Sequence, residues 1–441
     1  MEINYYKNYK TNKLPQGWVE CELKDIAEDI ISGTGFPKMY QGNDAGDYPF
    51  AKVGDISKLY RSSKKIIDSA ENYISEDIKN KIKGKVFPLN TIVFPKIGEA
   101  LKGNYRLITK RKMLFDNNVM GIYLSNNVDI LFLYYFLTTQ DFGRFSVATT
   151  VPSIQKGNIE KIKINLPPLN EQKRIVEKIE EEFGKIDEGV EKLKLAQEQI
   201  KQYRQSVLKS AFDGKLYKTT EWEEKMFRQV LEVNPKTDIP DIKDDDLISF
   251  LPMPAVQAEI NIYNEDFVKY SKVKKGYTKF KNRDVLFAKI TPCMENGKSC
   301  VVDNLKFGIG FGSTEFHILR SLGSILPEFV FYYVVQESFR KRAQNVMTGA
   351  VGQRRVPADY LKNISINLPT IDEQKQIVKE IEKRFEIADE VERVITENLD
   401  KAEQLKQSIL KKAFEGRLIP QDPNDEPAIG LLTKIKAERK K

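Results

Sequence analysis

A repeat decides the architecture of this chain: it begins at Leu166-Pro167-Pro168-Leu169-Asn170-Glu171-Gln172-Lys173 and returns, about 200 positions later, at Leu368-Pro369-Thr370-Ile371-Asp372-Glu373-Gln374-Lys375. The two copies match without a gap for about fifty residues, as far as Leu216 and Leu418. Both end alike with a glycine, Gly214 or Gly416, the residue type that commonly terminates a helix. The repeat therefore predicts one long helix that occurs twice.

Apolar residues recur at heptad spacing in each copy, which predicts long amphipathic helices over about 170–212 and about 372–414. Each would be on the order of 60 Å long, far more than a lone surface helix needs. An ordinary dimerisation coiled coil is one interpretation. Because both copies lie in one chain, we expect an antiparallel intramolecular coiled coil with pseudo-twofold symmetry. The residues expected at the helical spacer and partner interface are Ile179, Phe183, Ile186, Leu193, Ile200, Val378, Ile381, Phe385, Ile395 and Ile409.

The segments outside the repeated helices share a plan. Each opens near a tryptophan, Trp18 or Trp222, passes through an apolar strand into a basic loop, and reaches a short aromatic helix, about 131–138 or 328–335. A loop and a strand then lead to the Leu-Pro signal. We therefore predict the α+β class, with two recognition-type domains, 1–165 and 217–367, a central helical region, 166–216, and a C-terminal helical region and tail, 368–441.

Composition bounds the kind of protein. A chain of 441 residues has material for about two to four domains. The net charge of +8 fits a polyanion partner, although many proteins with such a charge bind none. Three cysteines without paired metal spacing favour a reduced cytosolic setting over a disulfide framework. The most apolar run, Ile130 to Leu137, is too short to span a bilayer, so we expect a cytoplasmic protein without a membrane partner.

Sequence signals of catalysis are weak. The stretch 307–312 imitates a glycine-rich cofactor loop, but no βαβ unit or acidic ribose partner surrounds it. Gly297-Lys298-Ser299 is similar to a phosphate loop, yet Pro292 stands where that motif requires glycine. A single histidine, His317, removes most metal and triad chemistry. We expect no catalytic residue, no metal site and no cofactor in this chain.

Taken together, these features resemble the specificity subunit of a Type I restriction-modification system, which has two target recognition domains and two helical spacer regions. The resemblance covers nearly everything from Leu14 to Glu426. It is specific at Leu14-Pro15 with Gly17-Trp18, at the two Glu-Gln helix starts, and at the stretches 284–298, 312–317 and 419–427. The second domain keeps only Trp222 of the opening motif, which leaves its exact start open.

The resemblance implies a non-catalytic reader of double-stranded DNA. Each recognition domain would bind one half of a bipartite target, and the helical pair would set the unread gap. The helical regions would dock methyltransferase subunits, expected to number two, and motor-nuclease subunits would join them. S-adenosylmethionine, ATP and Mg²⁺ would then belong to those partner subunits. The alternative is a coiled-coil assembly scaffold with incidental basic loops.

A DNA reader needs basic and amide side chains on loops, because Arg and Lys contact phosphate and guanine while Asn and Gln contact adenine. The candidates in the first domain are Lys96, Lys102, Asn104, Arg106, Thr149, Thr150 and Ser153, and those in the second are Lys289, Thr291, Asn296, Lys298, Gln353, Arg354 and Arg355. Any one of them alone could be an ordinary solvated side chain.

The last three form the strongest cluster, because the two glycines before them let the loop approach a groove closely. Lys289 comes next, and Lys96 occupies the matching position in the first domain. Glu315 could accept a hydrogen bond from cytosine or make an internal one.

Overall fold

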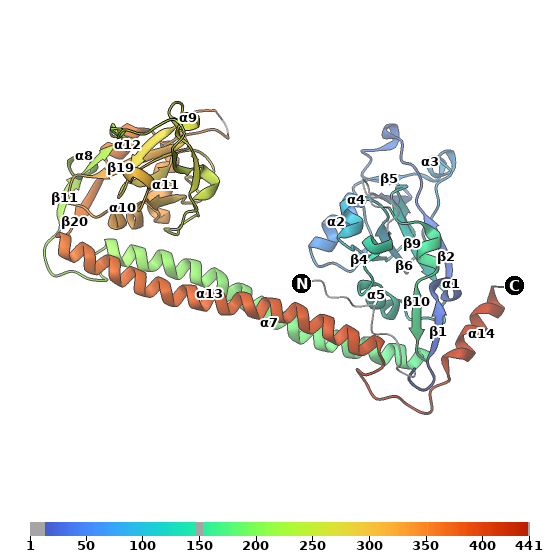
Figure 1. The fold of residues 1–441 in the computed structure, drawn as a ribbon. Coiled ribbons are helices and arrows are strands. Elements are labelled where there is room, and N and C mark those ends of the chain that lie inside the picture. The colour runs from blue at the N-terminus through green and yellow to red at the C-terminus, as the bar shows by residue number, and fades with distance from the viewer. Residues whose placement is uncertain (1–13, 146–152, 351, 440–441) are drawn as a thin grey trace. The chain divides into compact units, whose positions relative to one another are not determined.

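The computed structural model describes residues 14–145, 153–350 and 352–439 (Figure 1). The chain divides into two compact units, one made of residues up to 191 and from 399 onward, the other of residues 192–398. The boundary runs through both long helices, α7 (Leu169–Phe212) and α13 (Ile371–Phe414). Each unit therefore contains one α+β domain and a stretch of each long helix. Among the described helices, none combines the length and the apolar character needed to cross a membrane.

The described residues of the first domain form three sheets. Its strands are β1 (Val19–Glu22), β2 (Ala27–Ser32), β3 (Tyr48–Ala51), β4 (Ile66–Ile67), β5 (Tyr73–Ile74), β6 (Thr91–Pro95), β7 (Leu107–Thr109), β8 (Leu114–Phe115), β9 (Val119–Leu124) and β10 (Lys163–Leu166). Its helices are α1 (Leu23–Ile26), α2 (Val53–Arg61), α3 (Glu76–Lys81), α4 (Gly98–Lys102), α5 (Ile130–Thr138) and α6 (Lys156–Glu160), with short 3₁₀ turns η1 (Lys38–Tyr40) and η2 (Phe142–Phe145). The strand orders are β2-β9-β6-β7-β4, β5-β3-β8 and β1-β10.

The second domain, as far as the structure describes it, also has three sheets. Its strands are β11 (Glu223–Met226), β12 (Leu231–Val233), β13 (Leu247–Leu251), β14 (Asp266–Lys269), β15 (Thr278–Lys281), β16 (Val285–Ala288), β17 (Ser299–Val301), β18 (Ile309–Gly312), β19 (Phe316–Ser321) and β20 (Ser365–Leu368). Its helices are α8 (Phe227–Val230), α9 (Tyr270–Val273), α10 (Pro327–Val334), α11 (Glu337–Asn345) and α12 (Ala358–Lys362), with 3₁₀ turns η3 (Met253–Ala255) and η4 (Lys306–Gly308). The strand orders are β12-β19-β16-β17, β14-β13-β18-β15 and β11-β20.

The common plan predicted for the two domains is confirmed at the level of topology. The order β2-β9-β6-β7 in the first domain corresponds to β12-β19-β16-β17 in the second, and β6 and β16 are the apolar strands that enter the basic loops. In each domain the first strand pairs antiparallel with the strand that precedes the long helix, β1 with β10 and β11 with β20 (Figure 1). This pairing closes each domain at the point where its long helix begins.

The aromatic helices α5 and α10 are apolar on nearly all sides and therefore lie in the core, between their sheets and the long helices. In the first unit, Phe132 and Phe136 of α5 pack against Phe414 of α13, with ring centroids 5.4 and 5.5 Å apart. In the second unit, Phe329 of α10 packs against Phe212 of α7 at 4.7 Å. The last phenylalanine of each repeated helix thus anchors that helix in a core.

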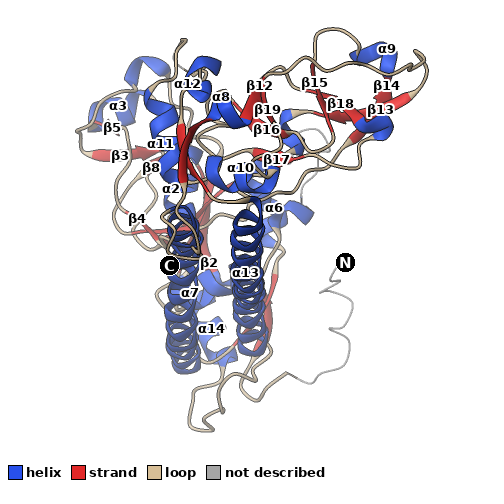
Figure 2. Cartoon of the chain, turned by 90° about the vertical axis from the view of Figure 1, so that its left-hand side faces the viewer, coloured by secondary structure: helices blue, strands red, loops and turns tan. Residues whose placement is uncertain are grey.

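Within each unit, α7 and α13 run side by side in opposite directions (Figures 1 and 2). In the first unit, Lys406 pairs with Asp187 at 2.5 Å and lies over the ring of Phe183. In the second, Arg204 pairs with Asp389 at 2.5 Å and lies over the ring of Phe385. Both contacts join an early position of one helix to a late position of the other, so the predicted antiparallel pairing is confirmed.

The predicted apolar stripe is buried or half-buried throughout, but not against the opposite helix alone. Ile179 is fully buried in the core of the first domain, with Phe183, Ile186 and Ile409 packed in or against the same core. The side chains that join the core of the second domain are Val378, Ile381 and Phe385. Ile200 and Ile395 are buried and Leu193 is half-buried. The stripe therefore fastens each helix to a domain as well as to the other helix.

The glutamine of the Glu-Gln pair at each helix start connects the long helix to another segment of its domain. Gln172, fully buried, accepts from the backbone N–H of Asp129 at 2.9 Å and donates to the carbonyl of Pro167 at 2.9 Å. Gln374 accepts from the N–H of Leu326 at 2.8 Å and donates to the carbonyls of Ser324 and Pro369. Asp129 and Leu326 precede the aromatic helices. Each glutamine therefore fixes the start of a long helix to the start of an aromatic helix.

The two glutamates before these glutamines do not act alike. Glu171 accepts from the indole N–H of Trp18 at 3.0 Å. Glu373 instead accepts from the N–H and hydroxyl groups of Thr219 and Thr220, and the indole nitrogen of Trp222 has no partner among the described residues. The second domain thus replaces the tryptophan contact with threonines, which fits the departure of its opening sequence from the Leu-Pro-x-Gly-Trp pattern.

Replacing Gln374 by leucine is expected to lower the free energy of unfolding by about 3 kcal/mol, because the backbone groups of Leu326, Ser324 and Pro369 lose their partner in a buried place. Chemical denaturation of the purified chain measures the change. Gln199→Leu, at an exposed position of α7, is the matched control and should stay within about 0.5 kcal/mol of the parent. An equal stability of the two variants would contradict this role of Gln374.

Candidate nucleic-acid interface

Lys96 and Lys289 occupy equivalent backbone positions, each at the end of the apolar central strand of its domain. In both cases the lysine N–H donates to the segment before the neighbouring strand, and the lysine carbonyl accepts from the segment before the last short helix. The four bonds are Lys96 N to Asn118 O at 2.8 Å, Ile154 N to Lys96 O at 2.9 Å, Lys289 N to Glu315 O at 2.9 Å, and Val356 N to Lys289 O at 2.9 Å. Three segments therefore meet at each strand end.

The strand end of the second domain brings the predicted arginine cluster next to Lys289. Ile290 forms a β-bridge with Arg355. The Arg355 guanidinium donates to both carboxylate oxygens of Glu315, at 2.9 and 2.7 Å, and to the carbonyl of Gln353 at 2.9 Å. This hydrogen bonding lowers the pKa of Glu315, which keeps its carboxylate ionised. Of the two interpretations of Glu315, the internal bond is the one that the structure shows.

Arg354 is less constrained than Arg355. Its side chain is 42% exposed, and its nearest carboxylate, that of Glu295, lies 3.9 Å away. The backbone carbonyl of Arg354 accepts from the N–H of Thr291 at 3.0 Å and lies 3.4 Å from the Thr291 hydroxyl. Gln353 is exposed. Thr291 thus supports the loop through its backbone, while Arg354 and Gln353 present their polar groups to solvent.

A cleft of about 530 Å³ opens beside Lys289. It is lined by Asn234, Pro235, Lys236, Thr237, Asp238, Tyr277, Thr278, Lys279, Lys289, Phe316 and Ile318. Three lysines against one aspartate give the cleft a positive charge that suits a phosphate backbone. Lys236 and Lys279 are not predictable as neighbours of Lys289 from sequence, because they come from segments far apart in the chain and carry no local motif.

The only histidine of the chain supports this cleft from inside. His317 is buried, its Nδ1 lies 2.9 Å from the side-chain amide of Asn234, and its Nε2 lies 2.8 Å from the carbonyl of Val356. Burial lowers the pKa of His317, so the ring is neutral at neutral pH. It therefore acts as a structural link between the cleft and the loop that carries Arg355.

The turn after Lys289 places its two candidates differently. Asn296 is exposed. Lys298 is half-buried, and its ammonium group donates to the carbonyl of Met253 at 3.1 Å. This bond holds the turn against η3, and the role of Lys298 in DNA binding stays a prediction.

In the first domain, Lys102 and Ser153 lie on segments next to the strand end. Lys102 is exposed on α4, where it pairs with Glu99 at 2.7 Å, and Ser153 forms a β-bridge with Ile97. Thr149 and Thr150 lie outside the described residues. The candidates Lys96, Lys102 and Ser153 are thus brought together around one strand end.

Arg106, a DNA-binding candidate from the sequence, is a buried side chain in the structure. Its side chain is fully buried, and it donates to the carbonyl of Asn104 at 2.8 Å, to the Asn104 side chain at 2.6 Å and to the carbonyl of Gln140 at 2.7 Å. Burial lowers the pKa of Arg106 to about 9. Arg106 therefore does not present its guanidinium at the surface in this structure. Asn104 is half-buried, and its role in DNA binding stays a prediction.

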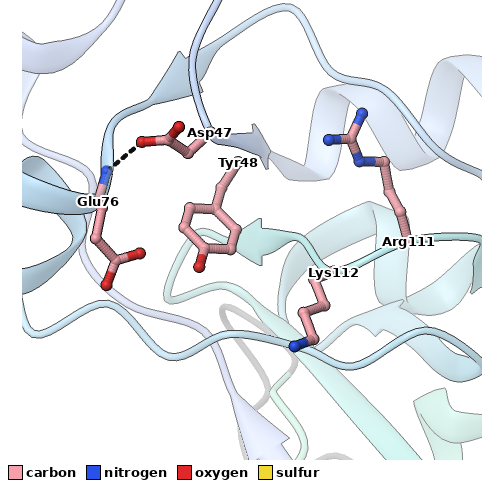
Figure 3. Close-up of a pocket in the computed structure, with 5 residues that line it drawn as sticks. All are labelled: Asp47, Tyr48, Glu76, Arg111 and Lys112. Atoms are coloured by element: carbon pink, nitrogen blue, oxygen red, sulfur yellow. Dashed lines mark hydrogen bonds between the residues drawn. The ribbon is translucent and has the colours of Figure 1, made fainter.

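A separate pocket of about 510 Å³ in the first domain is lined by Asp47, Tyr48, Glu76, Arg111 and Lys112 (Figure 3). Asp47 accepts from the backbone N–H of Glu76 at 2.7 Å. Arg111 and Lys112 are exposed, and they belong to no recognisable sequence motif. The pocket mixes both charges, and within the described ranges no group of three or more His, Cys, Asp or Glu side chains is placed to hold a metal ion.

Two α+β domains with one strand order, each fastened to an antiparallel pair of repeated helices and each with a basic strand end, define a duplicated two-domain protein. The model of the family described as Type I restriction modification DNA specificity domain matches residues 15–197 and again residues 219–401. The chain belongs to this family.

Individual relatives agree with the family assignment. The specificity subunit of the Type I restriction enzyme EcoAI from Escherichia coli is 34% identical over 261 residues, which are 49% of this chain and 44% of that protein. In this comparison the match spans less than half of the relative's length. The EcoKI specificity subunit from Escherichia coli K12 is 23% identical and matches 97% of this chain and 96% of its own.

A solved structure described as the structural basis of complex assembly and conformational transition of the type I R-M system shares the fold. Its TM-score is 0.68 at 17% identity, over 92% of this chain and 100% of that chain.

Proposed function

We propose that this chain is the DNA-specificity subunit of a Type I restriction-modification complex. The observation that carries the proposal is that the specificity-domain family model matches both copies, and that each copy ends its central strand in a lysine held by the same backbone bonds. Each domain binds one half of a bipartite double-stranded DNA target. The subunit performs no catalysis of its own and works in the cytoplasm, a setting consistent with its three free cysteines.

Different side chains contact the phosphates and the bases of the DNA. In the second domain, the cleft with Lys236, Lys279 and Lys289 holds the phosphate backbone, and the exposed Gln353 and the half-buried Arg354 reach base edges. In the first domain, Lys96 and Lys102 contact the phosphate backbone of the DNA. Phosphate contacts set position and affinity, while the base contacts set the sequence that is read.

The long helices set the length of the unread spacer and dock the partner subunits. Two methyltransferase subunits bind the helical regions, and motor-nuclease subunits complete the assembly. S-adenosylmethionine, ATP and Mg²⁺ are bound by those partners. The repeated ion pairs, Lys406 with Asp187 and Arg204 with Asp389, support this proposal, because they fix the register of the two helices within each unit.

Exchanging residues 217–367 for the second domain of a relative with another target is expected to change one half-site and leave the other half-site unchanged. Mapping of methylated sites in a host that expresses the chimera with the methyltransferase subunits measures this. A coiled-coil scaffold, the second candidate, would be indifferent to the exchange. An unchanged target in an active chimera would therefore reject the reader function and favour the scaffold.

A further inference from the structure

Arg106 of the first domain links two segments that are distant in the chain. It ends the loop between β6 and β7, and its Nη2 donates to the carbonyl of Gln140, which follows α5, at 2.7 Å. Its guanidinium carbon lies 4.2 Å from the ring centroid of Phe142 in η2. The Asn104 side chain, which accepts from Arg106, lies 3.4 Å from the N–H of Phe142. The loop that follows Lys96 is thereby joined to the segment after the aromatic helix.

Arg340 makes the corresponding link in the second domain, but it lies in the segment after the aromatic helix and reaches the loop after the central strand. It belongs to α11, which follows the aromatic helix α10, and it is 9% exposed. Its Nη1 donates to the carbonyl of Glu295, in the turn after Lys289, at 2.6 Å, and its Nη2 donates to the Glu259 carboxylate. A Cβ atom added to Gly297 would lie 3.2 Å from the Arg340 Nη1, so the turn packs directly on the guanidinium.

The two arginines do not correspond in sequence, yet they connect the same two parts of the fold. In each domain a buried guanidinium joins the loop after the central strand to the segment that leads toward the next candidate loop. In both, the Nε atom is buried without a hydrogen-bond partner among the described residues. Burying a cation whose N–H groups are not all hydrogen-bonded costs free energy of folding. Stabilisation of the fold alone therefore does not explain why both domains contain such an arginine.

We propose that Arg106 and Arg340 are positioning residues for sequence reading, each holding the loop after the central strand in the geometry that its half-site requires. The proposal rests on the proposed function, because it takes these loops to face DNA. Recognition by bidentate contacts tolerates only small displacements of the contacting group. A loop released from its arginine would still carry its charged residues, but would place them less accurately.

The test uses the full chain assembled with its methyltransferase subunits and carrying Arg106→Met or Arg340→Met. Methionine keeps the bulk of the side chain and removes the hydrogen bonds and the charge. Methylation rates are measured on the cognate target and on targets with one substituted base pair in either half. We expect each variant to lose about 10-fold in discrimination, in the half read by its own domain, and to keep the other half unchanged.

Arg228→Met is the matched control, since Arg228 is exposed and its side chain donates to Asn363, which belongs to neither loop. Each arginine variant also serves as the control for the other domain. Arg340→Lys should recover part of the discrimination, because a lysine can still donate to the Glu295 carbonyl. If Arg340→Met does not fold, Glu259→Ala removes one of its two anchors at a half-buried position and should weaken the same half-site.

Folded variants that discriminate as well as the parent would overturn the positioning role. Equal losses in both halves would also overturn it, since they would indicate general loosening of the chain. The domain exchange described above separates this failure from a failure of the proposed function. If the exchange changes a half-site while the arginine variants do not, only the positioning role is rejected.

Discussion

Replacing Gln353, Arg354 and Arg355 together by alanine is expected to weaken binding of the assembled complex to its target by at least about 10-fold and to relax specificity in one half-site. An arginine that grips guanine accounts for about 1 to 3 kcal/mol of discrimination. Binding to target and variant duplexes at several salt concentrations measures both effects. Unchanged binding by a folded triple variant would refute the placement of this loop on DNA.

The structure separates the contributions of the two arginines. Arg354→Ala should remove most of the base-pair discrimination if Arg354 contacts guanine, whereas a phosphate contact would weaken all sequences alike and flatten the salt dependence. Arg355 is bound on both sides, by Glu315 and by the Gln353 carbonyl. We therefore expect Arg355→Ala to act through the shape of the loop.

A double-mutant cycle checks that expectation for Arg355. If Arg355 supports the loop only through Glu315, then Arg355→Ala, Glu315→Ala and the double variant should weaken binding by similar amounts, because one interaction is lost in all three. If Arg355 leaves Glu315 to bind DNA, Glu315→Ala should instead strengthen binding. Lys362→Ala, at a half-buried lysine of α12 that pairs locally with Asp359, is the control for loss of a surface charge.

The repeat was enough to predict the architecture, because a copied helix with a copied terminator is visible in the sequence itself. Gly214 and Gly416 adopt positive φ angles of 69° and 68°, the conformation that the terminator assignment requires. The role of the Glu-Gln pair was not predictable. Gln172 and Gln374 bind backbone groups of segments about 45 residues earlier in the chain, and periodicity carries no information about such partners.

The candidate site was predicted less completely than the fold, for a physical reason. Residue type separates polar from apolar side chains, but it does not tell a solvated arginine from one buried with carbonyl partners. Arg106 and Arg354 look alike as loop arginines in the sequence, but the structure buries the first fully and leaves the side chain of the second 42% exposed. Lys236 and Lys279 were not among the candidates from the sequence, because only the packing of segments distant in the chain brings them beside Lys289.

The largest change in target is expected from lengthening the helices. One extra helical turn adds about 5.4 Å, somewhat more than one base-pair rise of DNA, and nearly preserves rotation about the helix axis. Inserting four residues after Leu193 is therefore expected to lengthen the unread spacer by about one base pair and to leave both half-sites unaltered. Genome-wide mapping of methylated sites in a host expressing the variant measures the spacer directly.

An insertion in α7 alone breaks its register with α13, and some loss of stability is expected from it. The paired contacts define a better variant. Asp187 and Arg204 flank the insertion in α7, while their partners Lys406 and Asp389 flank Leu399 in α13. A second four-residue insertion after Leu399 therefore leaves both ion pairs in place and restores a matched helical pair. If this double variant were active with the original spacer, or with altered bases inside a half-site, the helices would not act as a ruler.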